Sequence, residues 1–414
     1  MFHSRYLVEC EMRILIVSYH FPPRTDGAAT LMYNLCKYIP KEQYWVITAS
    51  GRFGARAVYQ GKDLGFYDSE YSLDCNATRL PLKSNRLIAR IVYIFLSVVN
   101  GFLLNLRKRF DCLLAVYPDE SDMYAATILQ LLLRIPLIIY MHDLYSEVRK
   151  RDRAYRIWRL LEDAVFARSS MIIVTNDIFR HYYLDRGLDH VEVLPSCVDC
   201  EESINQVASE TDEPSDRRLR VVYTGSVYAA HEDAIQCFLR AAQKVSGIEM
   251  IFCTPYRKKY LEGVSVGFLT KAKCRVLQRS ADVLLLPLAF CSPYPEEIRI
   301  AFPCKSLEYL AAGRPILAIV PAGSYAEEFV KKHDVGIVVN TPSEEKVMEA
   351  LEKLKMPAVR KRFSRNAQKA VCLYDAKVQA QNLMILLKRA ISENWTPTHS
   401  RTMLRSKTTR KSER

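Results

Sequence analysis

The sequence predicts an α/β protein with two Rossmann-like, doubly wound domains that face a cleft. Three observations lead to this prediction. The chain has 414 residues, which is too many for one compact core of ~100–200 residues. Short apolar runs alternate with helical patterns in both halves, as expected for parallel strands joined by helices. Residues 200–218 are polar and acidic and contain almost no large apolar side chains, so we expect a linker there.

The first domain is expected over residues 1–199. It begins with the apolar strand Arg13–Ser18, the helix Ala28–Tyr38 and the strand Tyr44–Thr48, whereas residues 49–85 are rich in loop residues and hold no placed element. The remaining elements are helices at Leu87–Leu106, Ser121–Leu133, Ala154–Ala167 and Asp177–Asp185, and strands at Cys112–Tyr117, Pro136–Met141, Met171–Thr175 and Val191–Leu194. Strands that alternate with helices in this way indicate a parallel, doubly wound sheet.

The second domain is expected over residues 219–375 and repeats the alternation. Its strands are expected at Leu219–Thr224, Glu249–Cys253, Val264–Phe268, Asp282–Pro287, Ile316–Val320 and Gly336–Val339, and its helices at Asp233–Val245, Lys271–Arg279, Cys304–Ala312, Tyr325–Lys332, Ser343–Leu354 and Ala358–Ala370. A long polar loop follows the strand Asp282–Pro287. The amphipathic helix Lys377–Ile391, within residues 376–392, is expected to return to the first domain. Residues 393–414 are expected to form a disordered basic tail.

The charge balance is strongly basic, with 59 Lys and Arg against 46 Asp and Glu and a net charge of +13. Such a charge fits nucleic acid, an anionic membrane surface or an anionic substrate. The tail from Trp395 holds six Lys and Arg and one Glu. This part of the charge gives little information about a site in the two domains. Because no nucleic-acid motif accompanies the charge, we expect no specific nucleic-acid partner.

One apolar segment, Leu87–Leu106, has nearly the ~20 residues that a membrane span needs. Arg90, Asn100 and Asn105 interrupt it, which favours a helix of the soluble fold with one unusually apolar face. Five basic residues bracket the segment: Arg86, Arg90, Arg107, Lys108 and Arg109. This is the profile of a helix that lies in an anionic interface, so residues 86–109 are a candidate membrane-binding surface.

The cysteines and the N-terminal residues bear on the compartment. Twelve cysteines are scattered, mostly within apolar runs, as is typical of small buried hydrophobic residues. The single close pair, Cys197 and Cys200, is a weak zinc signal without a second such pair. Residues 1–12 contain no apolar core of a secretory signal, and either Met1 or Met12 could be the start. We therefore expect a cytoplasmic protein. The membrane-binding hypothesis for residues 86–109 would place it peripherally on the inner face of the membrane.

Residues that follow strands are the first candidates for a site, because ligands of such sheets bind at the carboxyl ends of the strands. Gly27 precedes a helix whose free N–H groups suit an anion such as a diphosphate. His142 could contact a sugar hydroxyl and Asp143 could act as a base toward an acceptor hydroxyl, although the two could equally cap the next helix. Gly225 and Ser226 could donate N–H groups to phosphate or form a plain tight turn.

The stretch from Ser280 to Val320 is the most informative part of the second domain. Lys305 lies at the start of a helix, where a cation favours a phosphate group, and Glu308 could bind both hydroxyls of a ribose. A local Lys305–Glu308 pair on an exposed helix face is the alternative. Neither a G-x-G-x-x-G nor a P-loop motif is present, so dinucleotide redox enzymes and P-loop NTPases have no support.

These motifs resemble those of the GT-B glycosyltransferases, especially the retaining family 4. The matching segments are Tyr140–Asp143 (YMHD), Tyr223–Ser226 (YTGS), Ser280–Pro287 (SADVLLLP) and Phe302–Pro315 (FPCKSLEYLAAGRP), and the likeness covers about residues 13–391. The resemblance implies that Gly27 approaches the donor diphosphate, that His142 contacts the donor sugar and that Glu308 binds the donor ribose. It also implies that Lys305 clamps the leaving diphosphate.

The sequence departs from the family pattern at two places. The family often has a Glu eight residues before the ribose-binding Glu, but this position is Ile300 here, and Glu296 and Glu297 are out of register. The basic pair that usually follows the first strand of the second domain is missing. The contacts with the donor sugar and the stereochemistry therefore stay open.

The resemblance implies a glycosyltransferase, retaining and acting on hexosyl donors, which moves a sugar from a nucleotide diphosphate to a cell-surface glycan or a lipid-linked precursor. A nucleotide-sugar epimerase on the same fold is one alternative, and a non-catalytic, membrane-associated partner of a glycan assembly complex is another. No cofactor and no metal site is expected, because no Asp-x-Asp stands at a strand end in a donor-binding context.

Overall fold

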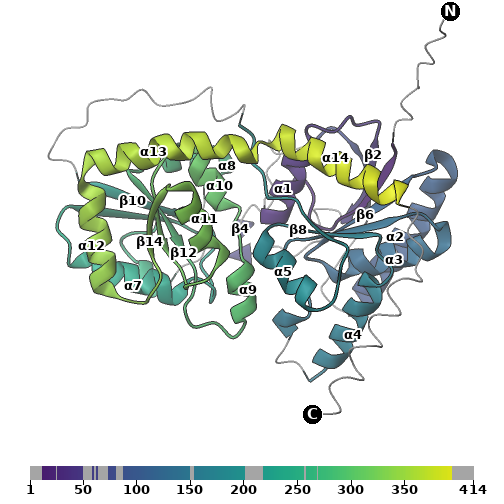
Figure 1. Ribbon diagram of the computed structural model, residues 1–414, viewed down its shortest axis with the longest axis horizontal. Coiled ribbons are helices and arrows are strands. Elements are labelled where there is room, and N and C mark those ends of the chain that lie inside the picture. Colours follow the sequence, from purple (N-terminus) through teal and green to yellow (C-terminus); the bar gives the residue numbers. More distant parts are fainter. Residues whose placement is uncertain are drawn as a thin grey trace, which may run out of the picture.

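The structure is a computed structural model that describes residues 12–24, 26–49, 58–59, 62–63, 73–80, 87–149, 153–200, 218–255, 258–267 and 269–393. Two α/β domains lie side by side along the long axis of the molecule (Figure 1). Each contains a parallel sheet between layers of helices, which confirms the predicted fold class. The linker expected over 200–218 and the tail expected over 393–414 lie almost entirely outside the described residues.

The first domain is built on a seven-stranded parallel sheet in the order β5-β2-β1-β6-β7-β8-β9. Its strands are β1 (Ile14–Val17), β2 (Tyr44–Ala49), β5 (Asn76–Leu80), β6 (Cys112–Tyr117), β7 (Leu137–Met141), β8 (Met171–Val174) and β9 (Val191–Val193). The continuous apolar runs of β1, β6 and β7 are buried on both faces. Because β1 pairs with β2 on one side and with β6 on the other, the sheet has its switch point there.

Helices cover both faces of this sheet (Figure 1). One layer holds α2 (Leu87–Lys108), α3 (Glu120–Leu133), α4 (Tyr155–Phe166) and α5 (Asp177–Asp185), and the other holds α1 (Gly27–Cys36) and α14 (Ala376–Ser392). Alternate residues of β1 divide between the layers: Leu15 and Val17 face the first, whereas Ile14 and Ile16 face the second. The core of the domain therefore lies on both sides of its sheet.

The second domain has a five-stranded parallel sheet in the order β11-β10-β12-β13-β14. Its strands are β10 (Leu219–Thr224), β11 (Ile248–Cys253), β12 (Val283–Pro287), β13 (Ile316–Ile319) and β14 (Gly336–Val339). One face is covered by α7 (Glu232–Gln243) and α12 (Glu344–Lys355), and the other by α10 (Lys305–Ala311), α11 (Tyr325–His333) and α13 (Pro357–Val371). The switch point lies at β10, which pairs with β11 and β12.

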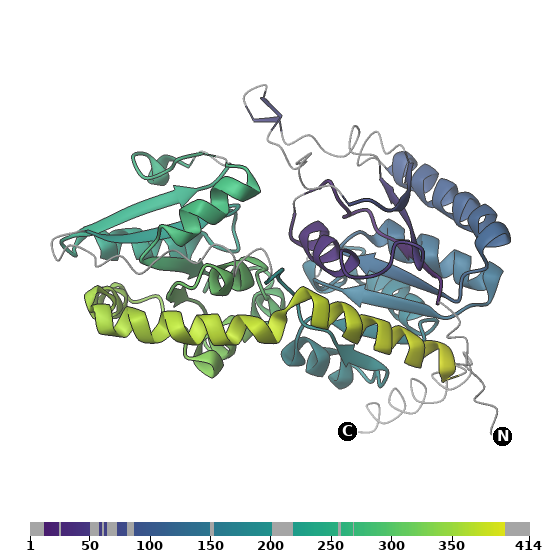
Figure 2. The ribbon, with the colours of Figure 1, turned by 90° about the horizontal axis from the view of Figure 1, so that it is seen from above.

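The C-terminal helices connect the two domains. After α13 and the short turn η3 (Cys372–Tyr374), α14 continues over the first domain, and Figures 1 and 2 show these helices running in succession along the molecule. Ala380, Leu383 and Leu387 of α14 are buried in the core that α1 shares with β1. The chain thus crosses between the domains twice, and Val198 pairs with Asp375 where the two crossings meet.

Several parts of the expected secondary structure were wrong or incomplete. Residues 264–267 do not form a strand, because only Ser265 makes an isolated bridge, to Phe252, and the last residue of the expected strand lies outside the described residues. The edge strand β5 lies in the region left without elements, where its sequence NATRL has few apolar residues to reveal it. The same region holds the two-residue strands β3 (Val58–Tyr59) and β4 (Lys62–Asp63), and the expected polar loop holds the helix α9 (Pro295–Ile300). The turns η1 (Glu147–Arg149) and η2 (Lys259–Leu261) were also not predicted.

Candidate functional site

A cavity of about 960 Å³ lies between the domains, and residues that follow β1, β7, β10 and β12 line it. All seven residues singled out in the sequence lie on its wall: Gly27, His142, Asp143, Gly225, Ser226, Lys305 and Glu308. The cavity is therefore at the carboxyl ends of both sheets, beside the two switch points, where open parallel sheets bind their ligands.

Asp26 organises the loop between β1 and α1. As the N-cap of α1, its carboxylate accepts a hydrogen bond of 3.0 Å from the backbone N–H of Ala29. The same carboxylate lies 2.9 Å from His20 Nδ1 and 2.8 Å from Arg24 Nε. Burial opposes its charge, but His20 and Arg24 lower the pKa of Asp26 below its ordinary value. This ionised cap fixes Gly27 at the helix end that faces the cavity.

His142 follows β7 and is neutral at physiological pH. Burial is the main cause that lowers the pKa of His142 to about 3, and the neighbouring His20 acts in the same direction. The ring packs edge-on against Tyr140, with 4.5 Å between the ring centroids. Its Nε2 is buried and has no hydrogen-bond partner among the described residues, so it can serve a polar group of a ligand in the cavity.

Asp143 meets Glu297, a residue of α9, across the cleft between the domains. The two carboxyl groups share a hydrogen bond, and Glu297 also accepts one of 3.0 Å from the backbone N–H of Leu144. Burial raises the pKa of both carboxyls, and the charge of Asp143 raises that of Glu297 further. The pair therefore holds a shared proton, so that one carboxyl donates while the other accepts.

Gly225 and Ser226 form a tight turn after β10, next to the side chain of Lys305. Gly225 has a φ of +130°, a conformation that favours glycine, and a Cβ there would lie 3.0 Å from Lys305 Nζ. Lys305 donates a hydrogen bond of 2.8 Å to the hydroxyl of Tyr223, which donates one of 2.6 Å to the carbonyl of Ser226. Tyr223 thereby ties the ammonium group to the turn.

Lys305 is a half-buried cation that lines the cavity. Burial lowers the pKa of Lys305 to about 8, although the charge of Glu308 acts in the opposite direction. Its Nζ lies 4.3 Å from the centroid of the Tyr223 ring, a cation–π distance. The side chain is thus still protonated at neutral pH and points at the glycine turn, which makes this corner of the cavity suited to an anion.

Glu308 is an ionised carboxylate with a partner on each oxygen. Its Oε1 accepts a hydrogen bond of 2.6 Å from Lys271 Nζ, and its Oε2 accepts one of 3.1 Å from Gln278. Burial opposes the charge, but Lys271 and Gln278 lower the pKa of Glu308 below its ordinary value. Each oxygen keeps a free lone pair, so the carboxylate can still accept hydrogen bonds from two neighbouring hydroxyls.

The structure corrects one local expectation and explains one departure from the family pattern. The exposed Lys305–Glu308 pair does not form, because Lys305 turns to Tyr223 while Glu308 binds Lys271. Ile300, at the position where the family has a Glu, is buried in the core of the first domain. One helical turn earlier, Glu297 lines the cavity instead, so the wall does contain a carboxyl group from this loop.

Four residues of the site were not found in the sequence: His20, Tyr223, Lys271 and Glu297. Lys271 belongs to α8 (Lys271–Arg279), whose composition is that of an ordinary solvated helix. A possible signal was the spacing of Lys271 and Gln278, which are seven positions apart and so share one helix face. Glu297 is out of register with the family's Glu in the sequence, and the helix α9 that places it at the cavity was not predicted.

Metal-binding clusters of His, Cys, Asp and Glu are not found in the described part of the chain. Cys197 and Cys200 are free and buried, and they belong to two different apolar cores. The chain passes from the first domain to the second at these residues, and each thiol fills a position in the core of one domain. Their close spacing therefore needs no shared metal.

The two walls of the cavity thus suit different parts of a ligand. The second domain offers a cation at a glycine turn and an ionised carboxylate, which fit an anionic group and a pair of hydroxyls. The first domain offers the neutral imidazole of His142 and the carboxyl of Asp143, which shares a proton with Glu297 of the second domain, and these groups fit uncharged hydroxyl groups. A ligand with a diphosphate and two sugar-like ends would use both walls.

Comparison with known proteins agrees with this geometry. Residues 25–202 match the family described as Glycosyltransferase Family 4, and residues 218–355 match the family described as Glycosyl transferases group 1. No curated protein sequence matches the chain.

Solved structures share the fold. Sucrose-phosphate synthase from Thermosynechococcus elongatus has 15% identity and a TM-score of 0.68 over 92% of this chain and 100% of its own. HepE of Anabaena, solved with UDP-glucose, has 14% identity and a TM-score of 0.65 over 91% of this chain and 100% of its own. A protein from Listeria monocytogenes described as a UDP-N-acetylglucosamine 2-epimerase has 10% identity and a TM-score of 0.59 over 94% of this chain and 98% of its own. With both halves matched by glycosyltransferase families and the two-domain fold shared, the chain belongs to the GT-B glycosyltransferases.

Proposed function

We propose that the chain transfers a sugar from a nucleotide-diphosphate donor to a cell-surface glycan or a lipid-linked precursor, with retention at the anomeric carbon. The observation that carries the donor assignment is the corner formed by Gly225, Tyr223 and Lys305 beside the carboxylate of Glu308. A diphosphate fits the cation and the turn, and a ribose fits the carboxylate. The UDP-glucose in the structure of HepE supports the same class of donor.

In this proposal the second domain stabilises the leaving group. The bond between the sugar and the diphosphate breaks as negative charge builds up on the diphosphate, and Lys305 lies where it can offset that charge. The low polarity around Lys305 strengthens the interaction. Because the cation comes from the chain itself, we expect turnover without an added divalent ion, which an assay in EDTA tests directly.

In this proposal, residues of the first domain contact the hydroxyl groups of the transferred sugar and of the acceptor. His142, neutral and with an unpartnered Nε2, would hydrogen-bond the transferred sugar. The Asp143–Glu297 pair can accept a proton from an acceptor hydroxyl as the new glycosidic bond forms. Since Asp143 and Glu297 come from different domains, this proton acceptor is complete only when the two domains are close.

Calorimetric titration with UDP- and GDP-sugars tests the donor assignment. The intact protein is expected to bind one of the two donor classes, and Glu308→Ala is expected to weaken that binding. A protein that binds neither class would overturn the proposal.

A nucleotide-sugar epimerase is the second candidate, and the Asp143–Glu297 pair is the observation that favours it. Two carboxyls that share a proton can remove and return protons on the sugar itself. NMR analysis of the donor incubated without any acceptor separates the two functions, because an epimerase changes the sugar whereas a transferase needs the acceptor.

We further infer that the first domain binds an anionic membrane surface, on the cytoplasmic side, through residues 86–109 and the helices beside them. Exposed apolar side chains continue from α2 to α3 and α4: Leu87, Ile88, Ile91, Val92, Phe95, Val99, Phe102, Leu103, Leu106, Ile128, Leu131, Leu132, Ile157, Leu160 and Leu161. A monomer rarely leaves an apolar surface of this extent in water.

The helix α2 is long and apolar enough to cross a membrane by length and composition, yet it packs on the domain. Tyr93, Ser97 and Gly101 form its buried face. A Cβ at Gly101 would lie 2.7 Å from a methyl carbon of Leu129 in α3, so the two helices are in close contact. An orientation in the plane of the interface agrees with this packing, because one face stays on the domain while the other meets the lipid.

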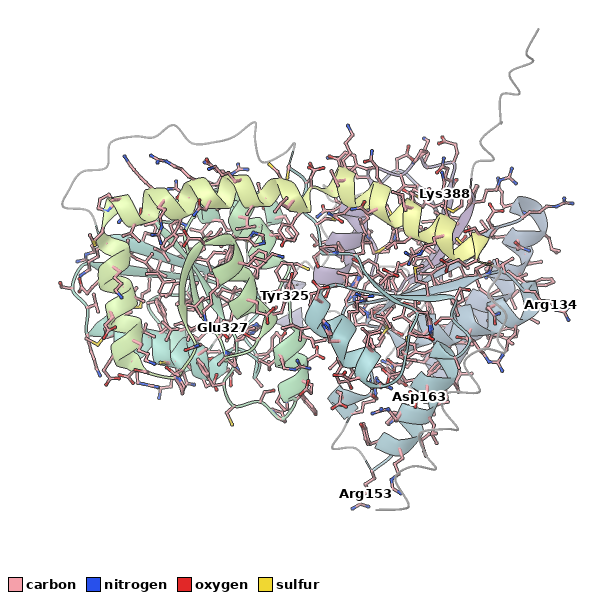
Figure 3. The ribbon with its side chains drawn as sticks, in the orientation of Figure 1. Arg134, Arg153, Asp163, Tyr325, Glu327 and Lys388 are labelled. Atoms are coloured by element: carbon pink, nitrogen blue, oxygen red, sulfur yellow. The ribbon has the colours of Figure 1, made fainter. Side chains whose placement is uncertain are left out.

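The charge around this surface favours anionic lipid. Five exposed arginines surround it without an ion-pair partner among the described residues: Arg107, Arg109, Arg134, Arg153 and Arg156. Arg134 and Arg153 project from the outer side of the domain in Figure 3. The acidic Glu120 and Asp163 are paired with Arg149 and Arg186. Exposed cations thus lie on or next to the same helices as the exposed apolar side chains, which supports binding to anionic lipid.

A further inference from the structure

Two cysteines of the second domain contact each other in the wall of the cavity. Cys253 is the last residue of β11, and Cys274 lies in the middle of α8. Their sulfur atoms are 3.6 Å apart, and both residues line the cavity. Among the described residues, no other two cysteine sulfurs form such a contact. Their sulfurs would have to approach by only about 1.5 Å to reach the S–S distance of ~2.05 Å.

The pair is connected to the donor corner on both sides. The backbone carbonyl of Cys253 accepts a hydrogen bond of 2.9 Å from the N–H of Gly225, in the glycine turn. Cys274 shares one face of α8 with Lys271 and Gln278, the two partners of Glu308. A change at either sulfur therefore acts on elements that hold the site.

We propose that Cys253 and Cys274 form an oxidisable thiol pair in the wall of the donor cavity, and that a disulfide between them weakens nucleotide binding. The second part rests on the proposed donor site. The oxidant is a peroxide, which reaches the sulfurs through the cavity. One thiolate attacks the O–O bond, becomes a sulfenic acid and releases water. The second thiol then displaces the sulfenic oxygen, which leaves as water with the remaining proton, so two thiols and one peroxide give one disulfide and two waters.

The chemistry of the two thiols suits this reaction. The hydrogen bond from the Cys274 thiol is the main cause that lowers the pKa of Cys253, and it outweighs the effect of burial. Cys253 is thus the better nucleophile toward peroxide, and Cys274 is already in contact with it as the resolving thiol. The Cys274 sulfur also lies 3.6 Å from the carbonyl oxygen of Leu269, in the turn before α8, so its side chain is positioned beside Cys253.

The bond would draw α8 toward β11. The contacts of Lys271 and Gln278 with Glu308, at 2.6 and 3.1 Å, are already at hydrogen-bond distance and cannot follow such a shift without loss. We therefore expect the oxidised protein to bind nucleotide about tenfold more weakly, as for one lost hydrogen bond to a charged group.

Peroxide treatment of the full chain tests the pair. After oxidation and digestion without reductant, mass spectrometry is expected to find a peptide linked through Cys253 and Cys274 that dithiothreitol separates. The affinities for UDP and for GDP are measured by calorimetry on reduced, oxidised and re-reduced protein, and the loss should be restored by the reductant. In Cys253→Ser and Cys274→Ser the affinity should no longer respond to peroxide, whereas the exposed Cys291→Ser and Cys372→Ser controls should respond as the parent does.

Two results would overturn the proposal. One is oxidation of Cys291 without any peptide linked through Cys253 and Cys274, and the other is a linked peptide with unchanged nucleotide affinity. A reduced protein that binds neither UDP nor GDP contradicts the donor site and the expected loss of affinity, while the linked peptide still decides whether the thiol pair exists.

Discussion

The two walls of the cavity differ in how they treat charge. In the second domain, Lys305 and Glu308 are ionised at neutral pH, because the charge of Glu308 supports that of Lys305 and Lys271 supports that of Glu308. In the first domain, burial keeps His142 neutral and lets Asp143 share a proton with Glu297. The difference agrees with the proposed division of labour, in which the second domain would bind the charged part of the donor and the first domain would exchange protons with hydroxyl groups.

The outer surfaces of the domains differ as well. In the first domain, exposed apolar side chains are concentrated on α2, α3 and α4, and α3 contacts both other helices. In the second domain they are scattered, as at Tyr228, Val266 and Met356. Among the described residues, the first domain is therefore the one proposed to bind lipid, and it is also the domain proposed to receive the acceptor.

The largest effect is expected from Lys305→Ala. Removing the cation takes away the charge that stabilises the leaving diphosphate, so kcat/KM should fall about 10³-fold. Steady-state kinetics with the preferred donor measure the loss. The control is Lys273→Ala, an exposed lysine on α8. A loss of less than threefold at Lys305 would mean that the second domain does not neutralise the diphosphate.

Variants of the Asp143–Glu297 pair are expected to change the rate of transfer rather than the affinity for the donor. Asp143→Asn should lower kcat about 10²-fold and leave donor affinity nearly unchanged, because a carboxamide cannot accept the proton of the acceptor hydroxyl. Glu297→Gln should act in the same direction with a smaller effect, since the amide can still donate to Asp143. Equal losses of donor affinity in both variants would contradict the division of labour.

Loss of the Glu308 carboxylate should weaken nucleotide binding about 10- to 100-fold. Glu308→Ala removes the acceptor of the ribose hydroxyls, and Lys271→Ala leaves the carboxylate without its charged partner. Both variants are measured by calorimetry with the nucleotide alone. If Lys271→Ala bound like the parent, the ion pair would be a structural contact without a role in the donor site.

Membrane binding should depend on the outer surface of the first domain only. Phe95→Asp with Leu106→Asp places two charges on exposed positions of α2, and sedimentation with vesicles rich in phosphatidylglycerol should fall about tenfold or more. Met356→Asp, exposed in the second domain, is the matched control. Neutral vesicles should bind the parent more weakly, and equal binding to both would argue against the role of the arginines. Vesicle binding without turnover on a broad donor panel would instead support the non-catalytic partner.

The smallest effect is the response to pH. Lys305 is charged below its pKa of about 8 and neutral above it, so kcat/KM should decrease as the pH rises through 8. At pH 9 about tenfold less of the enzyme would carry the cation, by the ordinary titration of a single group. Lys305→Arg, which stays charged, should remove this alkaline decrease even if its rate is lower. An unchanged profile in that variant would assign the decrease to another group.

The sequence predicted most of the architecture because the two sheets are made of continuous apolar runs. Strands such as Cys112–Tyr117 and Leu219–Thr224 are buried on both faces, and their alternation with helices leaves few other folds. The edge strand Asn76–Leu80 was missed for the converse reason: of its five residues only the last, Leu80, is buried.

The candidate site was predicted where a residue follows a strand or starts a helix, as for Gly27, His142, Gly225 and Lys305. Position along an element is visible in one sequence, so the sequence by itself determined which residues reach the cavity edge. It did not determine their partners. Lys271 reaches Glu308 from 37 positions away, and Glu297 meets Asp143 only because the two domains close on each other. These contacts, and with them the charge of each group, depend on burial and distance, which only the tertiary structure decided.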